Sequence, residues 1–241
     1  MMERIHLDIQ IRDSVEDHLF GLRWWLKETK GIPLEEMSSF FDSRLEDYPY
    51  HMERWNEAYR IFPDYLPPNT KDILDLGCGT GLEIDQILTR FPQANITGID
   101  MSSSMLKELS FKHPEVRLIK GNYCDVSFED KQYDAAVSFE SLHHLLPDKK
   151  LSLYQKILSA LNKNGVLLNC DYFACCDEEE DLLRSVLAEK RKAEAIPDEM
   201  VVHFDIPLTL EHEADLLEKA GFRSCIALSS HSGACFLLAK P

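Results

Sequence analysis

The chain has 241 residues, of which 44% are hydrophobic, so it can bury a full core and global disorder is excluded. Its 26 basic and 42 acidic side chains give a formal charge of −16, which argues against binding of nucleic acid or of an anionic membrane. No apolar stretch approaches the roughly 18 residues of a membrane span, and the start lacks a signal-peptide pattern. The seven scattered cysteines form no disulfide framework, so we expect a cytoplasmic protein.

The first part of the chain, residues 1–66, has the pattern of a helical segment that stands apart from the core. Ser14 can cap a helix whose apolar positions recur every three or four residues. Apolar faces around 37–45 and over 51–61 indicate two further helices. Prolines and an asparagine over 63–69 then interrupt the pattern, so we expect a helical N-terminal cap to end there.

Residues 71–241 alternate between apolar β-forming runs and helical patterns, which is typical of a parallel, doubly wound α/β sheet. A helix over 151–161 is expected to end at Asn164-Gly165. Residues 177–208 begin with an acidic run and indicate a helical insertion. Two runs joined by a turn close the chain, so the last strand should be antiparallel to its neighbour. The expected strands span 72–76, 95–100, 116–120, 133–139, 165–172, 222–228 and 234–239.

Three glycines follow the first of these strands, in the segment Asp75-Leu76-Gly77-Cys78-Gly79-Thr80-Gly81. Glycines at such a turn let the backbone approach a ligand without a Cβ in the way. The helix that follows offers free N–H groups to an anionic ligand group. Asp100 ends the next strand, where a carboxylate can accept two hydrogen bonds from a ribose diol. Together these features predict a site for a nucleotide cofactor.

The spacing of the glycines separates two classes of cofactor. A dinucleotide-binding turn would place its third glycine at position 82, which is Leu82 here. The segment instead resembles the first motif of class I S-adenosylmethionine-dependent methyltransferases. The resemblance extends from about residue 72 to 240 and best fits the broad type 11/12 methyltransferase group. The other segments that carry it are Ile99-Asp100-Met101-Ser102, Gly121-Asn122-Tyr123, Tyr133-Asp134-Ala135-Ala136-Val137-Ser138, Phe139-Glu140-Ser141-Leu142-His143-His144-Leu145 and Gly221-Phe222.

The resemblance implies a Rossmann-like sheet of seven strands in the order 3-2-1-4-5-7-6, with S-adenosylmethionine as the cofactor. It also implies a place for each binding residue. The methionine part of the cofactor would be lined by Gly77, Gly79 and Gly81, with Asp75 supporting this loop. The ribose would be held by Asp100, and the adenine would be covered by Met101, Asn122 and Tyr123. The amino group of the cofactor would be bound by the carbonyl of Ser138.

Methyl transfer from such a cofactor needs little from the protein beyond positioning, because the sulfonium methyl group is already activated. The acceptor must lie in line with the methyl–sulfur bond, in a site that excludes water. A hydroxyl, thiol or ammonium acceptor also needs a base. Glu140, His143 and His144 follow the fourth strand of the core and are the candidates, while capping or packing would explain the histidines equally well. Tyr50 and Tyr59 are the predicted lid residues.

We expect no metal site. Cys170, Cys175 and Cys176 are close in sequence, but they lack the spacing of a metal chelate and no histidine follows at a suitable distance. They are predicted to be packing thiols.

We therefore predict an enzyme that methylates a small-molecule acceptor. Three alternatives stay open: a tRNA-modifying enzyme related to carboxy-S-adenosylmethionine synthase, a non-catalytic cofactor-binding protein, and an NAD-dependent oxidoreductase. The first resembles the chain in having a helical insertion before its final hairpin. The acidic composition disfavours nucleic acid as a partner, and formation of a homodimer through the added helices stays open as well.

Overall fold

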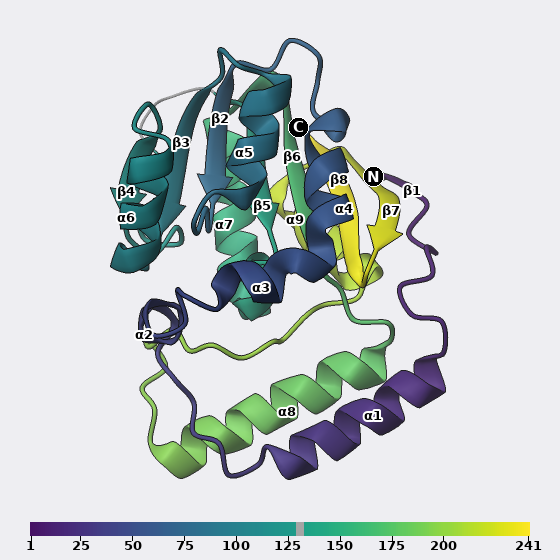
Figure 1. The fold of residues 1–241 in the computed structure, drawn as a ribbon. Coiled ribbons are helices and arrows are strands. Elements are labelled where there is room, and N and C mark those ends of the chain that lie inside the picture. The colour runs from purple at the N-terminus through teal and green to yellow at the C-terminus, as the bar shows by residue number, and fades with distance from the viewer. Residues whose placement is uncertain (129–132) are drawn as a thin grey trace.

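The computed structural model describes residues 1–128 and 133–241 of the chain. Within these residues, one eight-stranded sheet forms the centre of the molecule (Figure 1). The strands are β1 (Glu3–Ile5), β2 (Asp72–Leu76), β3 (Asn95–Asp100), β4 (Arg117–Lys120), β5 (Tyr133–Phe139), β6 (Leu161–Tyr172), β7 (Ser224–His231) and β8 (Ala234–Lys240).

The strands lie in the order β1-β7-β8-β6-β5-β2-β3-β4. Strands β2 to β6 run parallel to one another, whereas β8 is antiparallel to both β6 and β7. The prediction of a doubly wound α/β sheet with an antiparallel last strand is confirmed, and so is the expected order of the seven core strands. Because the parallel strands end at one edge, the loops after β2, β3 and β5 meet there, where α/β proteins bind their ligands.

The expected count of seven strands misses β1 at the edge of the sheet. This strand pairs in parallel with β7, and the N–H of Glu3 donates to the carbonyl of Arg223 at 2.8 Å. Arg4 extends the contact through ion pairs with Asp215 and Glu218 at 2.8 and 2.6 Å. A strand of three residues with two charged side chains has no alternating pattern, so sequence periodicity could not reveal it.

Helices cover both faces of the sheet, and none in the described parts of the chain is long and apolar enough to cross a membrane. The α-helices are α1 (Val15–Glu28), α2 (Met37–Asp42), α3 (Tyr48–Met52), α4 (Asn56–Ile61), α5 (Leu82–Arg90), α6 (Ser103–Lys112), α7 (Pro147–Ala160), α8 (Asp177–Glu194) and α9 (Leu210–Ala220). Short 3₁₀ helices span Glu53–Trp55, Phe62–Tyr65 and Leu142–His144.

The end of α7 differs from the prediction. The helix stops at Ala160 and β6 begins at Leu161, so Asn164 and Gly165 belong to the strand and do not cap the helix. A Cβ on Gly165 would lie 2.9 Å from the carbonyl oxygen of Tyr133, at the point where the pairing of β5 with β6 shifts register. The glycine therefore serves a close approach between strands.

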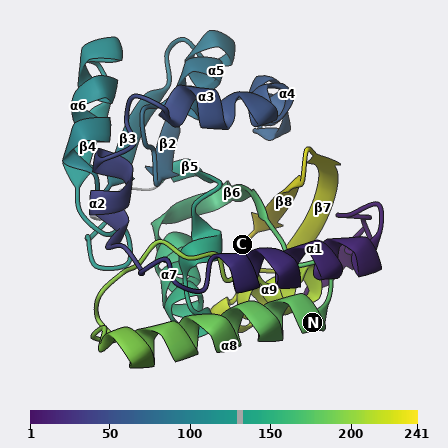
Figure 2. The same ribbon diagram turned by 60° about the horizontal axis from the view of Figure 1, so that its bottom comes forward.

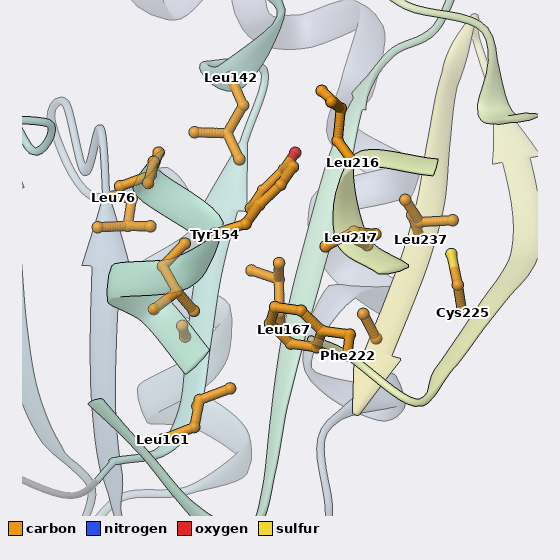
Figure 3. Packing of buried hydrophobic residues seen from close by; sticks show 14 of the residues in the cluster. Leu76, Leu142, Tyr154, Leu161, Leu167, Leu216, Leu217, Phe222, Cys225 and Leu237 are labelled. Atoms are coloured by element: carbon orange, nitrogen blue, oxygen red, sulfur yellow. The ribbon is translucent and has the colours of Figure 1, made fainter. Parts of the chain in front are cut away.

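Each face of the sheet has its own apolar core. On one face, Ile84 and Ile87 of α5 pack with Tyr59 of α4 and Leu109 of α6. On the other, α7 and α9 supply Tyr154 and Leu217, which gather with other buried side chains around Leu167 of β6 (Figure 3). Burial of apolar surface on both faces holds the sheet between the two layers of helices and fixes the edge at which the loops meet.

Helices α1 and α8 lie side by side at the edge of the sheet where its loops meet, although they are distant in sequence (Figures 1 and 2). Leu26 of α1 and Leu187 of α8 belong to one small apolar cluster with Val202 and Ile206. Ser14 caps α1 as predicted, by accepting the N–H of Asp17 at 3.2 Å.

Only part of the insertion over 177–208 is helical. Helix α8 ends at Glu194, and Ala195 adopts a φ of +51°. The chain then continues without a helix to Thr209, and Val202 bridges to Glu36 ahead of α2. Through this bridge, the non-helical segment after α8 contacts the N-terminal part of the chain.

Candidate active site

The glycine loop between β2 and α5 forms one wall of a cavity at the carboxyl edge of the sheet. Gly77 and Gly79 line this cavity, with φ angles of +81° and +47° that side-chain-bearing residues rarely adopt. The N–H groups of Gly77 and Cys78 both donate to the carbonyl of Ile99, at 2.8 and 3.2 Å, which ties the loop to β3. A Cβ on Gly77 would lie 2.2 Å from Oγ of Ser141, so only glycine fits.

Asp100 lies at the end of β3 and lines the same cavity. Its Oδ2 accepts the N–H of Gly79 at 2.9 Å, and its Oδ1 accepts the N–H of Ser102 at 2.7 Å. Burial raises the pKa of Asp100, and these backbone donors oppose the rise. Each carboxylate oxygen can accept a second hydrogen bond, so the group can still bind a pair of hydroxyls.

Met101, Asn122 and Tyr123 also line the cavity. Oδ1 of Asn122 accepts the N–H of Cys124 at 2.8 Å. Its NH₂ group remains to donate a hydrogen bond to a ligand. The hydroxyl of Tyr123 lies 3.2 Å from Oγ of Ser141, which fixes the ring beside the glycine loop.

Three of the predicted cofactor residues, Asp75, Gly81 and Ser138, do not line this cavity. Gly81 precedes α5, and its position packs against the side chain of Leu109. Oγ of Ser138 donates to the carbonyl of Leu76 at 3.0 Å. These residues shape the strands and the turn around the cavity.

Asp75 forms a buried acidic pair with Glu83 of α5. Both side chains are fully buried, and burial raises the pKa of Asp75 to about 8 and that of Glu83 well above its usual range. The pair therefore retains protons at neutral pH and places little negative charge behind the glycine loop.

Glu140 and His144 come to the cavity from the loop after β5. Glu140 adopts a φ of +48°, and its Oε1 is buried with no hydrogen-bond partner in the described residues. Burial raises the pKa of Glu140 to about 8. Burial, together with the charge of the adjacent His143, lowers the pKa of His144 well below its usual range. At neutral pH the cavity thus holds a protonated carboxyl group and a neutral imidazole.

His143 faces away from this cavity, into an ion-paired network. Its Nδ1 lies 2.6 Å from Oδ1 of Asp171, and its Nε2 lies 3.4 Å from Oδ1 of Asp205. Burial alone would lower the pKa of His143, but the two carboxylates outweigh it and raise the pKa well above the usual range. His143 is therefore a charged residue buried at the centre of the network, out of reach of a ligand in the cavity.

The predicted lid residues lie elsewhere. Tyr50 is 74% exposed, and Tyr59 is buried with its ring stacked on Phe139 at 3.9 Å. The aromatic side chains of the first 66 residues that do line the cavity are Phe41 of α2 and Tyr48 of α3. The sequence contains a group of aromatic residues within its first 66 positions. The spacing of these residues along the helices could not show which of them face the sheet.

Comparison with known proteins agrees with this geometry. The family of methyltransferase domains matches residues 73–165, which include the glycine loop, Asp100 and His144. Over residues 73–165 the chain therefore carries a class I S-adenosylmethionine-dependent methyltransferase domain. The cofactor of this methyltransferase is S-adenosylmethionine, so the reading as an NAD-dependent oxidoreductase is set aside.

The relatives of this methyltransferase differ in what their names describe. The carboxy-S-adenosyl-L-methionine synthase of Nautilia profundicola is 24% identical over 207 residues, which are 78% of this chain and 85% of that protein. The trans-aconitate 2-methyltransferase of an Enterobacter species is 34% identical over 118 residues, 49% of this chain and 46% of that protein. Human N-acetylserotonin methyltransferase, solved in complex with S-adenosylmethionine, has a similar fold, with a TM-score of 0.64 at 19% identity over 94% of this chain and 66% of that chain.

Proposed function

We propose that this methyltransferase methylates a hydroxyl group of a small molecule, with His144 as the general base. The observation that carries the proposal is the state of His144 in the cavity. Its Nδ1 points to the carbonyl of Phe204 at 3.3 Å and therefore holds the proton of the neutral ring. Nε2, which has no hydrogen-bond partner in the described parts of the chain, keeps its lone pair and can accept a proton.

When bound, S-adenosylmethionine supplies a methyl group that is already activated by a sulfonium sulfur. The chain needs to hold the acceptor in line and to take its proton. The transfer would join the acceptor oxygen to the methyl carbon and would leave the electron pair of the broken carbon–sulfur bond on sulfur. The hydroxyl proton passes to Nε2 of His144. The imidazolium that results lies beside Asp205, whose Oδ1 is 3.4 Å from Nδ1, so the new positive charge is stabilised.

The cofactor-binding roles follow the predicted ones, with adjustments from the geometry. Gly77 and Gly79 would contact the methionine part, with Asp75, Gly81 and the carbonyl of Ser138 fixing the backbone around it. Asp100 would bind the ribose hydroxyls, and Met101, Asn122 and Tyr123 would surround the adenine. Glu140, protonated at neutral pH, would donate a hydrogen bond at the reacting end.

We also propose that different parts of the chain bind the cofactor and cover the acceptor. Residues 71–241 would form the cofactor-binding core, and residues 1–66 together with the insertion 177–208 would cover the acceptor. The contacts between α1, α2 and the segment after α8 support this arrangement. A cover that encloses the site suits a small acceptor, which the name of the Enterobacter relative also describes.

Replacement of His144 tests the proposal. His144→Gln should lower kcat by about 10²- to 10³-fold, because a general base contributes on this scale, and change the affinity for S-adenosylhomocysteine less than about threefold. Transfer of labelled methyl groups into a metabolite extract identifies an acceptor for the assay. The exposed His51→Gln serves as the control and should keep full activity. Undiminished kcat in His144→Gln would exclude the base role.

A second candidate function is synthesis of carboxy-S-adenosylmethionine, because synthases of this kind match along most of their length. The added carboxylate of that nucleotide needs a cationic partner. No lysine or arginine lines the cavity within the part of the chain that the structure describes, which favours the uncharged methyl group. Calorimetry with both nucleotides decides between them: tighter binding of the carboxylated one would favour the synthase. Cofactor binding without any labelled product would favour a non-catalytic binding protein.

Formation of a homodimer and a cytoplasmic location are further predictions. Helix α1 exposes Phe20 and Trp24 at 75% and 61%, an apolar face that a second copy would cover in a dimer. Sedimentation velocity of the wild type and of Trp24→Glu tests dimerisation, since a charge on this face should shift the protein to monomer.

A further inference from the structure

We propose that a second cavity, enclosed by α1, α8 and the segment 203–205, binds the methyl acceptor as an uncharged, ring-bearing molecule. This cavity, here termed the cover cavity, has a volume of about 380 Å³. That size falls within the range of small-molecule pockets. The proposal rests on the proposed function, because it names the class of molecule that the same site would methylate.

The cover cavity meets the cofactor cavity at a shared wall of imidazole rings. His144 lines the cofactor cavity and His203 lines the cover cavity, and their ring centroids are 4.9 Å apart. Asp205 lines the cover cavity and contacts His144 from that side. His144 therefore lies in the wall between the two cavities, with Nδ1 toward Asp205 of the cover cavity, and the hydroxyl of an acceptor held in the cover cavity must extend past this wall to reach Nε2.

The wall is also neutral where the hydroxyl would enter. Burial lowers the pKa of His203 to about 4, and the ring of His203 stacks on Phe40 with centroids 3.5 Å apart. Facing it are the positive charges of Arg44 and His143 and the negative charges of Glu35 and Asp205. With both His203 and His144 neutral, an acceptor hydroxyl can donate to the wall without facing an exposed cation there.

The charged side chains around the cover cavity already have partners. Arg44 donates to both carboxylate oxygens of Glu35 at 2.7 and 3.1 Å. Lys190 donates to the carbonyls of Lys30 and Ile32. Asp205 is held by His143 and His144. A charged acceptor would be buried without a free counter-ion, which is costly, so the cavity selects an uncharged one.

The remaining walls are apolar and partly flat. Trp25, Phe40 and Phe204 supply aromatic surfaces, and Leu22, Ile32 and Leu183 supply aliphatic ones. Aromatic side chains pack best on planar groups in stacked or edge-to-face arrangements. The acceptor class is thus a hydroxylated ring compound, in which the ring lies between α1 and α8 and the hydroxyl points to the imidazole wall.

The test compares three ligands with the protein saturated with S-adenosylhomocysteine. These are 2-naphthol, 2-naphthoate, which has the same rings with a charge, and decahydro-2-naphthol, which is not planar. Calorimetry should show binding of 2-naphthol, with at least tenfold weaker binding of the other two. Equal affinity for naphthoate, or no binding of naphthol, would overturn the proposal.

Two variants test whether the ligand binds in the cover cavity. Ile32 is 56% exposed at the wall of the cover cavity, and Ile32→Trp would fill its opening. This change should weaken naphthol binding at least tenfold and leave S-adenosylhomocysteine binding unchanged. Phe20→Trp, on exposed α1 surface outside the cavity lining, is the matched control and should alter neither. Unchanged naphthol affinity in Ile32→Trp would overturn the cover cavity alone, whereas loss of the His144-dependent transfer is the separate test of the proposed function.

Discussion

The two walls of the proposed active site are built in different ways. The floor, made by the glycine loop and Asp100, comes from two successive strands, and backbone hydrogen bonds fix it. The cover, made by α1, α2, α8 and the segment 201–206, joins parts of the chain that lie more than a hundred residues apart. An apolar cluster and a backbone bridge between Glu36 and Val202 hold it together. The floor should therefore tolerate almost no change, whereas the cover should vary with the acceptor.

The strongest way to break this comparison is to add one methyl group to each wall. In Gly77→Ala the new Cβ would lie 2.2 Å from Oγ of Ser141 at a φ of +81°, so affinity for S-adenosylhomocysteine should fall by about 100-fold or more. Gly21 of α1 has nothing within 4 Å of its Cβ position. Gly21→Ala should keep full affinity and gain about 0.5–1 kcal/mol of stability. Calorimetry and thermal unfolding measure both; equal loss of affinity in the two variants would contradict the distinction.

Asp100→Asn should have the next largest effect. An amide cannot accept from both backbone N–H groups that Asp100 now binds, because its NH₂ would face one of these donors. We expect the affinity for S-adenosylhomocysteine to fall about tenfold or more. Ser102→Ala keeps the carboxylate and serves as the control, with a change below about threefold. An unchanged dissociation constant in Asp100→Asn would refute the ribose role.

The floor was predictable because its signal is local. Three glycines and an aspartate at the ends of neighbouring strands follow from the chain itself, and the structure brings Gly77, Gly79 and Asp100 to one cavity. The cover was not, because its geometry depends on contacts between distant segments. His143 and His144 are adjacent in sequence, yet one faces the buried Asp171 and the other faces the cofactor cavity. No local pattern contains that difference.

Glu140→Gln should change how the stability of the protein depends on pH. Burial raises the pKa of Glu140 to about 8 from an ordinary value of 4.5, so the folded protein binds more protons than the unfolded chain between these values. Wild-type stability contributed by this group is fully present below about pH 4.5 and is lost as pH rises through 8. Relative to the wild type, the glutamine variant should gain stability over this window, by up to a few kcal/mol, and gain nothing further above it. Thermal unfolding without cofactor at several pH values checks this, with the exposed Glu189→Gln as a control that should stay parallel to the wild type. A constant difference between pH 5 and 8 would contradict the buried, protonated state.

The smallest expected effect lies where the two walls meet. Asp42, at the end of α2, accepts hydrogen bonds from the hydroxyls of Ser102 and Ser104 at the start of α6, next to Asp100. Asp42→Ala should cost about 1 kcal/mol and weaken cofactor binding only a few-fold, because the floor keeps its own backbone bonds. Amide hydrogen exchange should speed up in residues 37–48 while the glycine loop stays protected. Asp47→Ala removes the same group from the same segment but no capping bond, so it should leave exchange unchanged. Faster exchange in the glycine loop of Asp42→Ala would mean that the floor depends on its cover, and that the two walls form one cooperative unit.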